Sequence, residues 1–299
     1  MDRHQQMRVF LAVSQTLSLA SAARQLELSA PTVTRAIDAL EKRLGLALMH
    51  RSTRGVVMTE AGERVASDCQ RILQHLQEAE ASATGLHTEP RGHLTVSMPL
   101  LLGQQLMTPV LLEYLQQFPH VEIFARYLDR HPNLHEEGID VAILGGSLPD
   151  SSLFALKAGS VRRVVCGSPD YLKRQGIPRQ PEDLLQHQII HSHADSRLPE
   201  WRFQVGAESR QYPLRPRLSC ATNQAAIQAA CLGGGLTRCM SYQVHEQLMS
   251  GQLCTVLDDY QLPALPLHVV YREGRRAAAR VRSFVDFAVA QLRDHPALN

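Results

Sequence analysis

The sequence predicts an α/β protein that begins with a helical part and continues with alternating strands and helices. Helical periodicity dominates to about residue 87. The break "EPRG" at 89–92 is then followed by the strand-like run "LTVSM". Beyond this break, short β-rich runs alternate with helical ones, an order that favours parallel sheets covered by helices. At 299 residues the chain is long enough for two hydrophobic cores.

The composition is that of a soluble globular protein, with 44% hydrophobic and 20% charged residues. The first apolar run is broken by Ser, Gln and Thr, so it fits neither a signal peptide nor a membrane span. The six cysteines show no C-x-x-C pair and no zinc-finger spacing, which favours free thiols over disulfides or a metal site. We therefore expect a cytoplasmic protein without a membrane partner, cofactor or metal.

The net charge of +2 says little about partners, but the charge is unevenly distributed. The first sixty residues hold eight Lys or Arg against five acidic residues. This modest basic bias at the amino terminus is compatible with a polyanionic partner, and the clustering of the arginines matters more than their number.

The first three predicted helices cover residues 4–15, 19–26 and 30–44. Ser29 is placed to cap the third helix, and Pro31 lies in its first turn, where a missing N–H is tolerated. An apolar stripe on this helix faces a core and consists of Val33, Ile37, Leu40 and Leu44. The residues off this stripe near the amino end are Ala30, Thr32, Thr34 and Arg35. We expect them to face a partner outside the protein.

Residues 45–59 are predicted to form a small basic hairpin, with Gly55 between two short alternating runs. A fourth helix is predicted at 60–87, with Thr59 as its N-cap and two glutamates in its first turn. Its apolar positions recur at heptad spacing: Val65, Cys69, Ile72, Leu76, Ala79 and Ala83. This seam predicts a self-association helix. The alternative is that it packs on the chain's own second domain.

The remaining elements are predicted from short apolar runs and helical periodicity. The expected strands are 94–98, 121–128, 141–144, 163–168, 187–192, 218–221, 236–240, 254–258 and 267–272. The expected helices are 104–117, 168–174, 222–232, 241–250 and 274–293. In sheets of this kind, ligands bind outside the carboxyl ends of the strands, so residues just after strands are the candidates for a binding site.

The segment 19–44 has the parts of a helix-turn-helix, because Ala22 and Ala23 allow two helices to approach closely. With the hairpin that follows, "FLAVSQTLSLASAARQLELSAPTVTRAIDALEKRLGLALMHRSTRGVVMTEAGE" resembles the winged helix-turn-helix of LysR-type transcriptional regulators. Three later stretches are similar to the effector-binding domain of the same family: "VAILGGSLPDSSL", "SPDYLKRQGIPRQPEDLLQHQII" and "LPLHVVYREGRRAAARVRSFVDFAVAQL". The resemblance covers nearly the whole chain.

The resemblance implies an α/β protein in three parts. Residues 1–59 would form an all-α winged helix-turn-helix, and residues 60–90 a long linker helix. Residues 91–299 would form an effector-binding domain like that of type 2 periplasmic binding proteins. Its subdomain I would comprise about 91–162 and 267–299, and its subdomain II about 163–266, with the ligand in the cleft between them.

The resemblance also implies roles in DNA binding. Arg35 matches a contact to guanine or a close phosphate, and Thr32 and Thr34 match contacts to bases in the major groove. Serines at helix starts match phosphate contacts, and the two arginines of the hairpin match the wing. The full set is Ser18, Ser21, Ser29, Ala30, Pro31, Thr32, Thr34, Arg35, Arg51 and Arg54. The alternative for each arginine is a solvated surface charge.

For the effector site the resemblance implies residues that follow strands or begin helices. They are Ser97, Met98, Pro99, Leu100, Leu101, Gly145, Gly146, Ser147, Thr222 and Asn223. The polar members would hydrogen-bond a small polar group, and the apolar ones would form walls. For Ser97 and Thr222 the alternative is helix capping.

The sequence departs from the family pattern at two positions. Glu27 occupies the turn where the family often has glycine or asparagine, and a left-handed conformation there would cost on the order of 1 kcal/mol. Leu144 stands where relatives commonly carry an arginine that would hold an anionic effector.

These features predict a DNA-binding transcriptional regulator and not an enzyme. It would dimerise through the 60–87 helix, form a homotetramer through its effector domains, read an interrupted palindrome and contact RNA polymerase. An effector in the cleft would shift the arrangement of dimers. The alternative is a cytosolic solute-binding or catalytic α/β protein with an oligomerising helical amino terminus. A metal pair at His191 and His193 would need more ligands than the sequence places nearby.

Overall fold

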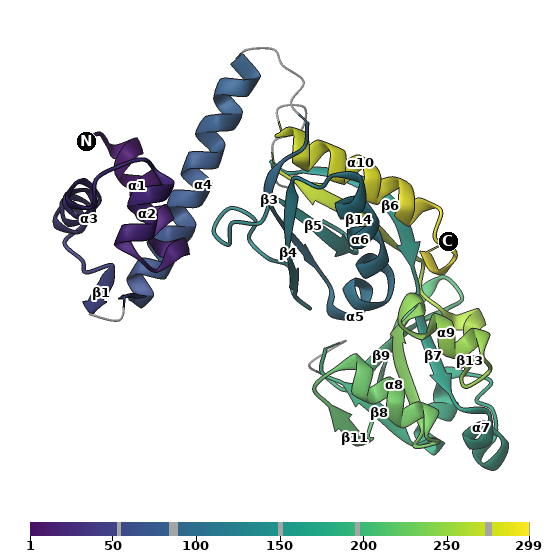
Figure 1. The fold of residues 1–299 in the computed structure, drawn as a ribbon. Coiled ribbons are helices and arrows are strands. Elements are labelled where there is room, and N and C mark those ends of the chain that lie inside the picture. Colours follow the sequence, from purple (N-terminus) through teal and green to yellow (C-terminus); the bar gives the residue numbers. More distant parts are fainter. Residues whose placement is uncertain (53–54, 84–88, 149–151, 195–197, 273–276, 299) are drawn as a thin grey trace. The chain divides into compact units, whose positions relative to one another are not determined.

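The computed structural model describes residues 1–52, 55–83, 89–148, 152–194, 198–272 and 277–298, with only the backbone described at 52, 74–75 and 77–83. The chain divides into two compact units, Met1–Thr88 and Glu89–Asn299. Figure 1 shows the helical first unit and the α/β second unit, each of which is treated separately below.

The amino-terminal unit begins with three helices, α1 (Arg3–Thr16), α2 (Leu19–Gln25) and α3 (Ala30–Leu44). All three predicted helices are confirmed. Their buried faces form one core, to which α3 contributes Val33, Ala36, Ile37 and Leu40, each at most 2% exposed. The prediction for Leu44 was wrong: its side chain is 41% exposed. The helix ends there, at Gly45 in the left-handed conformation, so the apolar stripe passes beyond the core.

The turn between α2 and α3 contains Glu27 in the left-handed region, with a φ of 54°. The backbone N–H of Leu28 donates to the carbonyl oxygen of Ala23 at 2.9 Å, which closes the turn. The turn geometry that favours glycine is thus retained with a glutamate, at a conformational cost on the order of 1 kcal/mol.

The predicted hairpin is present as β1 (Met49–Ser52) and β2 (Gly55–Met58), which pair antiparallel with Arg51 opposite Val56. Its start is fastened to α3, because Oε1 of Glu41 accepts bonds from the N–H groups of Leu48 and Met49 at 2.7 and 3.3 Å. The predicted wing residue Arg54 lies outside the described residues.

The long helix α4 (Glu60–Ala83) follows immediately, and Thr59 is its N-cap as predicted, with Oγ1 accepting from the N–H of Gly62 at 2.9 Å. A methyl group added at Gly62 would lie 1.9 Å from the carbonyl oxygen of Leu48. Only glycine therefore allows the helix to start this close to the hairpin.

The two halves of the predicted heptad seam have different environments. Val65 and Cys69 pack into the core of the amino-terminal unit. Ile72 and Leu76, one and two turns further on, are 51% and 40% exposed. The side chains of Ala79 and Ala83 lie outside the described part of the chain.

The second unit contains two five-stranded sheets, each flanked by helices. The first sheet has the order β4 (Val121–Tyr127), β3 (Gly92–Met98), β5 (Val141–Gly145), β14 (Leu265–Tyr271) and β6 (Phe154–Val161). Its helical layer consists of α5 (Leu100–Leu102), a π-helix (Gly103–Met107), α6 (Thr108–Gln117) and α10 (Ala279–Arg293). Figure 1 shows α6 and α10 running together beside this sheet, and Tyr114 and Phe284 join them in an edge-to-face contact at 5.1 Å.

The second sheet has the order β11 (Pro216–Cys220), β8 (Ile189–Ser192), β12 (Leu236–Met240), β7 (Arg163–Gly167) and β13 (Cys254–Val256). Its helices are α7 (Pro169–Gln175), α8 (Asn223–Cys231) and α9 (His245–Met249), with short 3₁₀ turns at Pro181–Gln186, Ser241–Val244 and Asp258–Tyr260. A hairpin of β9 (Glu200–Val205) and β10 (Glu208–Pro213) packs Trp201 and Phe203 into the core of this part.

The expected parallel pairing is present in only part of each sheet: β3 is parallel to β4 and β5, and β8 is parallel to β11 and β12. In the first sheet β14 is antiparallel to both β5 and β6, and in the second β7 is antiparallel to β12 and β13. These strands are the ones that carry the chain between the two sheets, so they cannot follow the simple strand-helix-strand order. Strand β6 and the β9–β10 hairpin were not predicted, because most of their side chains are not buried and form no continuous apolar run.

Among the described residues, no helix combines the length and the apolar character that crossing a membrane requires. The six cysteines, all within the described residues, are not joined by disulfides.

Candidate DNA-binding surface and ligand cavity

The amino end of α3 is presented to solvent. Ser29 caps the helix, since its Oγ accepts from the N–H of Thr32 at 3.3 Å and lies 2.7 Å from the hydroxyl of Thr32. Ser29, Ala30, Pro31 and Arg35 are exposed, and Thr32 and Thr34 are half-buried. The core side of the helix is fully buried, so the predicted recognition residues lie together on the open side.

Arg35 reaches over the first turn of its own helix. Its Nε donates to the carbonyl oxygen of Pro31 at 3.3 Å, and its two terminal nitrogens have no protein partner within the described chain. A guanidinium in this position is free to form a bidentate contact with a planar acceptor pair.

Ser18 and Ser21 are placed differently from the residues of α3. The hydroxyl of Ser18 caps α2 by accepting from the N–H of Ser21 at 3.3 Å, and the hydroxyl of Ser21 accepts from Arg24 at 3.2 Å. Both serines are half-buried at the start of α2. Their hydroxyls are engaged with their own helix, whose first N–H groups also lie at this end.

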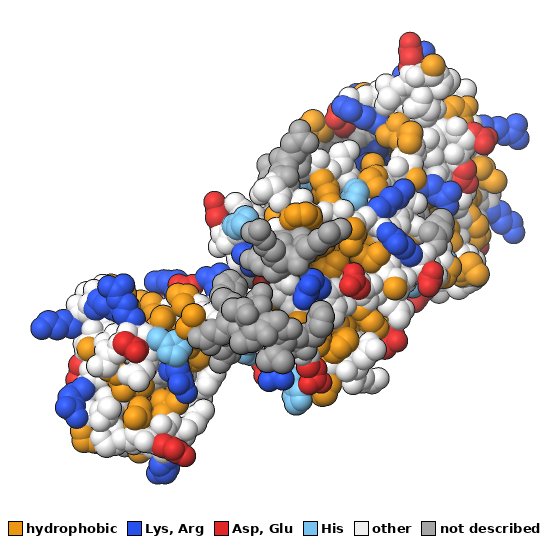
Figure 2. Space-filling view, turned by 90° about the horizontal axis from the view of Figure 1, so that it is seen from above, with side chains coloured by type: hydrophobic (Ala, Val, Ile, Leu, Met, Phe, Trp, Pro, Cys, Tyr) orange, Lys and Arg blue, Asp and Glu red, His pale blue; other side chains and the backbone are white. Residues whose placement is uncertain are grey.

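Arg51 on the hairpin is paired with α3. Its guanidinium lies 2.6 Å from the carboxylate of Asp38 and 3.8 Å from that of Glu41, and its side chain is 34% exposed. Part of the wing's charge is therefore neutralised within the protein. Figure 2 shows further Lys and Arg side chains, in blue, on the surface of the amino-terminal unit; those exposed on α1 to α3 include Arg3, Arg8, Arg24, Lys42 and Arg43.

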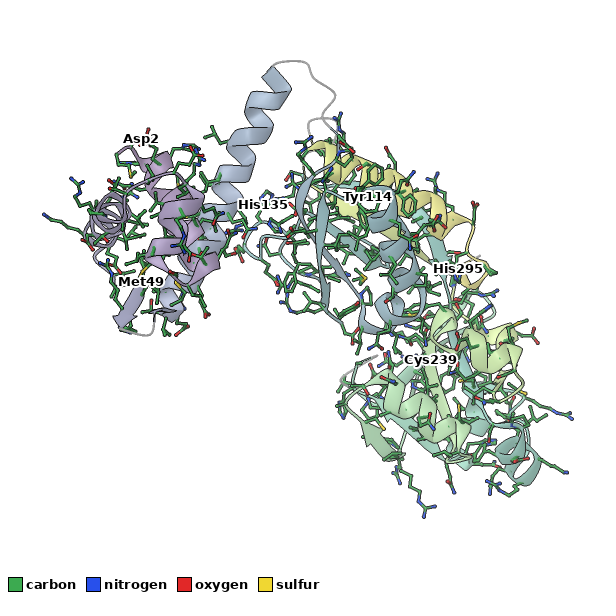
Figure 3. All side chains as sticks on the ribbon, viewed as in Figure 1. Asp2, Met49, Tyr114, His135, Cys239 and His295 are labelled. Carbon is green, nitrogen blue, oxygen red and sulfur yellow. The ribbon has the colours of Figure 1, made fainter. Side chains whose placement is uncertain are left out.

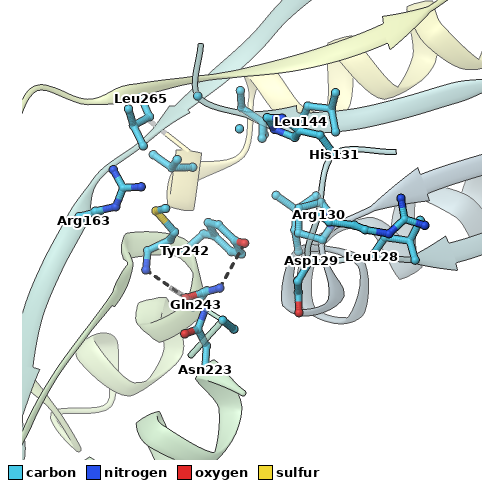
Figure 4. Close-up of a pocket in the computed structure, with 18 of the residues that line it drawn as sticks. Leu128, Asp129, Arg130, His131, Leu144, Arg163, Asn223, Tyr242, Gln243 and Leu265 are labelled. Carbon is cyan, nitrogen blue, oxygen red and sulfur yellow. Dashed lines mark hydrogen bonds between the residues drawn. The ribbon is translucent and has the colours of Figure 1, made fainter. Parts of the chain in front are cut away.

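The second unit contains a cavity of about 390 Å³ between its two sheets. Figure 4 shows it at close range, with residues from both subdomains facing each other. Five of the predicted effector residues line it: Pro99, Gly145, Gly146, Ser147 and Asn223. The other lining residues are Leu102, Leu128, Asp129, Arg130, His131, Leu144, Val161, Arg163, Ala194, Met240, Tyr242, Gln243, Leu265 and Leu267.

The other five predicted residues are not among the lining residues. Ser97, Met98 and Leu101 are buried in the first subdomain. Leu100 uses its backbone N–H to bind Oδ1 of Asp129 at 3.0 Å, and Thr222 caps α8 through a bond from the N–H of Ala225 at 3.3 Å. The structure thus assigns Thr222 the capping role that the sequence left as an alternative.

The loop after β4 is held by a group of ion pairs. Glu137 accepts from both terminal nitrogens of Arg130, at 2.6 and 2.7 Å, and from Arg126 at 3.1 Å. Hydrogen bonding to Arg130 is the main reason why the pKa of Glu137 falls to about 2. This arrangement fixes the segment Leu128–His131 at the edge of the cavity.

The second subdomain contributes a hydrogen-bonded pair of side chains. Nε2 of Gln243 donates to the hydroxyl of Tyr242 at 3.4 Å, and Oε1 of Gln243 accepts from the N–H of Met240 at 3.0 Å. Burial, followed by the charge of Asp129, raises the pKa of Tyr242 well above its usual range, so the phenol stays protonated. Oδ1 of Asn223 is buried and has no hydrogen-bond partner within the described residues.

His191 on β8 and His193 just after it do not form a recognisable metal site. The rings of His191 and His193 lie 5.1 Å apart in an edge-to-face arrangement. Within the described ranges, no group of three or more His, Cys, Asp or Glu is placed to hold a metal ion.

Two family models match the two units described above. The model for "Bacterial regulatory helix-turn-helix protein, lysR family" matches residues 4–63, and the model for "LysR substrate binding domain" matches residues 87–293. The chain belongs to the LysR family of transcriptional regulators. This assignment supports a DNA-binding regulator with an effector-binding domain over the alternative of a solute-binding or catalytic protein.

Similar proteins agree with the LysR assignment over the full length. An HTH-type transcriptional regulator of Xanthomonas campestris is 34% identical, covering 95% of this chain and 84% of the relative. The regulator CrgA of Neisseria meningitidis is 30% identical, covering 96% of both chains. The solved structure of CrgA matches with a TM-score of 0.62 at 28% identity, covering 98% of this chain and 99% of that one. The Vibrio cholerae virulence activator AphB matches with a TM-score of 0.61 at 27% identity, covering 97% and 99%.

In this LysR-family chain, sequence reasoning missed one group of cavity residues at the end of β4 and another after β12. Leu128 to His131 directly follow β4, and Tyr242 and Gln243 begin one residue after the end of β12. The rule that ligands bind beyond the carboxyl ends of strands applies to both places.

Proposed function

We propose that this LysR-family protein regulates transcription by binding an interrupted palindrome in double-stranded DNA through α3. The observation that carries the proposal is the open amino end of α3, where Arg35 has unpaired terminal nitrogens beside two half-buried threonines. Arg35 would bind a guanine or a phosphate, and Thr32 and Thr34 would contact base edges or methyl groups.

Phosphate contacts would fix the position of the helix on the duplex. Ser29, Ala30 and Pro31 lie where the first turn of α3 meets solvent, and Ser18 and Ser21 lie at the start of α2. The N–H groups at such helix ends attract phosphates. Arg51 and Arg54 would contact the backbone or minor groove from the hairpin, with Arg51 sharing its charge with Asp38.

Dimerisation would occur through the helix at 60–87, whose exposed Ile72 and Leu76 continue an apolar seam. We assign residues 1–59 to DNA binding, 60–90 to this linker and 91–299 to effector binding. Homotetramer formation through the last domain and contact with RNA polymerase complete the proposal. The protein would act in the cytoplasm, without a cofactor, by linkage between ligand and DNA rather than by catalysis.

An electrophoretic mobility shift with the DNA upstream of the protein's own gene tests the proposal. Specific binding should weaken steeply with salt because phosphate contacts release counterions. Arg35→Ala should cost about 1–3 kcal/mol and relax sequence specificity. Lys42→Ala, at the other end of the same helix, is the matched control and should have a smaller effect. Absence of specific, salt-sensitive binding by the native protein would instead favour a solute-binding or catalytic protein.

A further inference from the structure

One end of the cavity presents the carboxylate of Asp129. One of its oxygens accepts from the N–H of Leu100 at 3.0 Å, and Figure 4 shows Asp129 facing Tyr242 across the cavity. Oδ1 of Asn223 has almost no accessible surface, so it is not offered to a ligand. Because a carboxylate only accepts hydrogen bonds, this end of the cavity favours a ligand group that donates one.

Tyr242 adds a donor to the same end. Its hydroxyl oxygen already accepts from Nε2 of Gln243 at 3.4 Å, so its own hydrogen is available to a ligand. The amide of Gln243 is held in turn by the N–H of Met240. A group that both donates and accepts, such as a hydroxyl, therefore matches this end better than a group that only accepts.

The cationic side chains of the cavity do not favour a carboxylate at this end. The two terminal nitrogens of Arg130 donate to the two carboxylate oxygens of Glu137, at 2.6 and 2.7 Å. Arg163 lies beside Leu265, on the opposite side of the cavity from Asp129 in Figure 4. A carboxylate bound near Asp129 would meet a like charge, and the neighbouring Arg130 is already paired with Glu137.

The remaining walls are apolar. Leu102, Leu128 and Leu267 line the cavity, together with Leu144, whose side chain is 8% exposed and packs with Ile139 and Val270. Leu144 also stands at the position where the family pattern led us to expect an arginine. A volume of about 390 Å³ with such walls suits a small molecule that is mostly hydrocarbon.

We propose that the effector is an uncharged small molecule with an apolar skeleton and a hydroxyl group that binds between Asp129 and Tyr242. This inference depends on the proposed role of the cavity as the effector site. The hydroxyl donates to the carboxylate of Asp129 and accepts from the phenol of Tyr242. The leucine walls contact the skeleton, and no charge on the ligand is required.

Isothermal titration calorimetry on the full-length protein without DNA tests the proposal with matched probes. The probes are 2-phenylethanol, 2-phenylethylamine and phenylacetate, and the same three head groups on a naphthalene skeleton. The alcohols should bind about tenfold more tightly than the carboxylates on at least one skeleton, because the carboxylate leaves the acceptors unpaired.

Variants locate the hydroxyl within the cavity. Tyr242→Phe should weaken alcohol binding about tenfold, because it removes the phenol that donates to the ligand hydroxyl. Gln224→Ala, at an exposed position of α8 that does not line the cavity, is the control and should leave binding unchanged. Asp129→Asn keeps an acceptor for the N–H of Leu100 but removes the negative charge. It should therefore reduce the difference in affinity between the alcohol and the carboxylate probes. Leu144→Arg, if it folds, should reverse that preference.

Three results would overturn the proposal: tighter binding of the carboxylates or amines by the native protein, no binding of any probe, or full alcohol affinity in Tyr242→Phe. A mobility shift on the same preparations keeps the two proposals separate. Loss of specific DNA binding would count against the proposed regulator, whereas normal DNA binding with failed calorimetry would count only against the hydroxyl ligand.

Discussion

The candidate DNA-binding surface and the ligand cavity are built in opposite ways. The first comes from one helix start and the adjoining hairpin, so its residues are close in the sequence and share one local geometry. The second is assembled from segments that follow β3, β4, β5, β12 and the start of β7, which are far apart in the chain. A contiguous surface depends on local capping and periodicity, whereas an assembled cavity depends on topology.

The largest expected effect concerns the scaffold of the contiguous surface. Gly62→Val should destabilise the amino-terminal unit by about 3 kcal/mol, because a side chain would collide with the carbonyl oxygen of Leu48. Urea unfolding followed by circular dichroism measures this change. Ser67→Ala on the exposed face of α4 is the control. If Gly62→Val were as stable as the native protein, the hairpin and α4 could move apart to accommodate the side chain at little cost.

The next prediction concerns the scaffold of the cavity. The folded-state pKa of Glu137, about 2, lies below the ordinary value of 4.5, so its contribution to stability is present above about pH 4.5. The contribution is lost as the pH falls from there toward 2. The stability difference between native protein and Glu137→Gln, measured by urea unfolding, should be constant at neutral pH and shrink over this window. A difference that does not depend on pH would contradict the assignment.

A smaller effect is expected at the turn before α3. Glu27→Gly should stabilise the amino-terminal unit by about 0.5–1 kcal/mol, because glycine adopts a φ of 54° without steric cost. Glu27→Ala keeps the strained conformation and should give little or no gain. Thermal unfolding distinguishes the two variants, and equal stability of both would mean that the turn relaxes without strain.

The smallest effect should come from the ion pair between the hairpin and α3. Asp38→Asn should change stability by less than about 1 kcal/mol, because an exposed pair contributes little. It should nevertheless strengthen DNA binding a few-fold, since it removes a negative charge beside Arg51. A mobility shift at low and high salt checks this, and weaker binding of the variant would show that the pair mainly positions the hairpin.

Local features of the sequence predicted the amino-terminal unit well, because its helices are set by caps and by the spacing of apolar residues. The caps Ser29 and Thr59 and three of the four stripe residues of α3 are found as expected, whereas Leu44 is exposed. The sheets were harder to predict, since strand direction is decided by long-range pairing. For the cavity, Asn223 and Ser147 are implied by the resemblance to the family's effector domain, but Tyr242 and Asp129 meet only because two separate sheets face each other.

The close approach of Gly62 to Leu48 bears on the spacing of the two DNA half-sites that a dimer would bind. No side chain separates the start of α4 from the hairpin, and Glu41 holds the hairpin to α3 by hydrogen bonds. Helix α3, the hairpin and the start of α4 therefore move as one rigid body. In a dimer joined along α4, the distance between the two recognition helices would then be set by the register in which the two α4 helices pair. Shifting that register by one heptad would change the spacing of half-sites without altering any residue that touches a base.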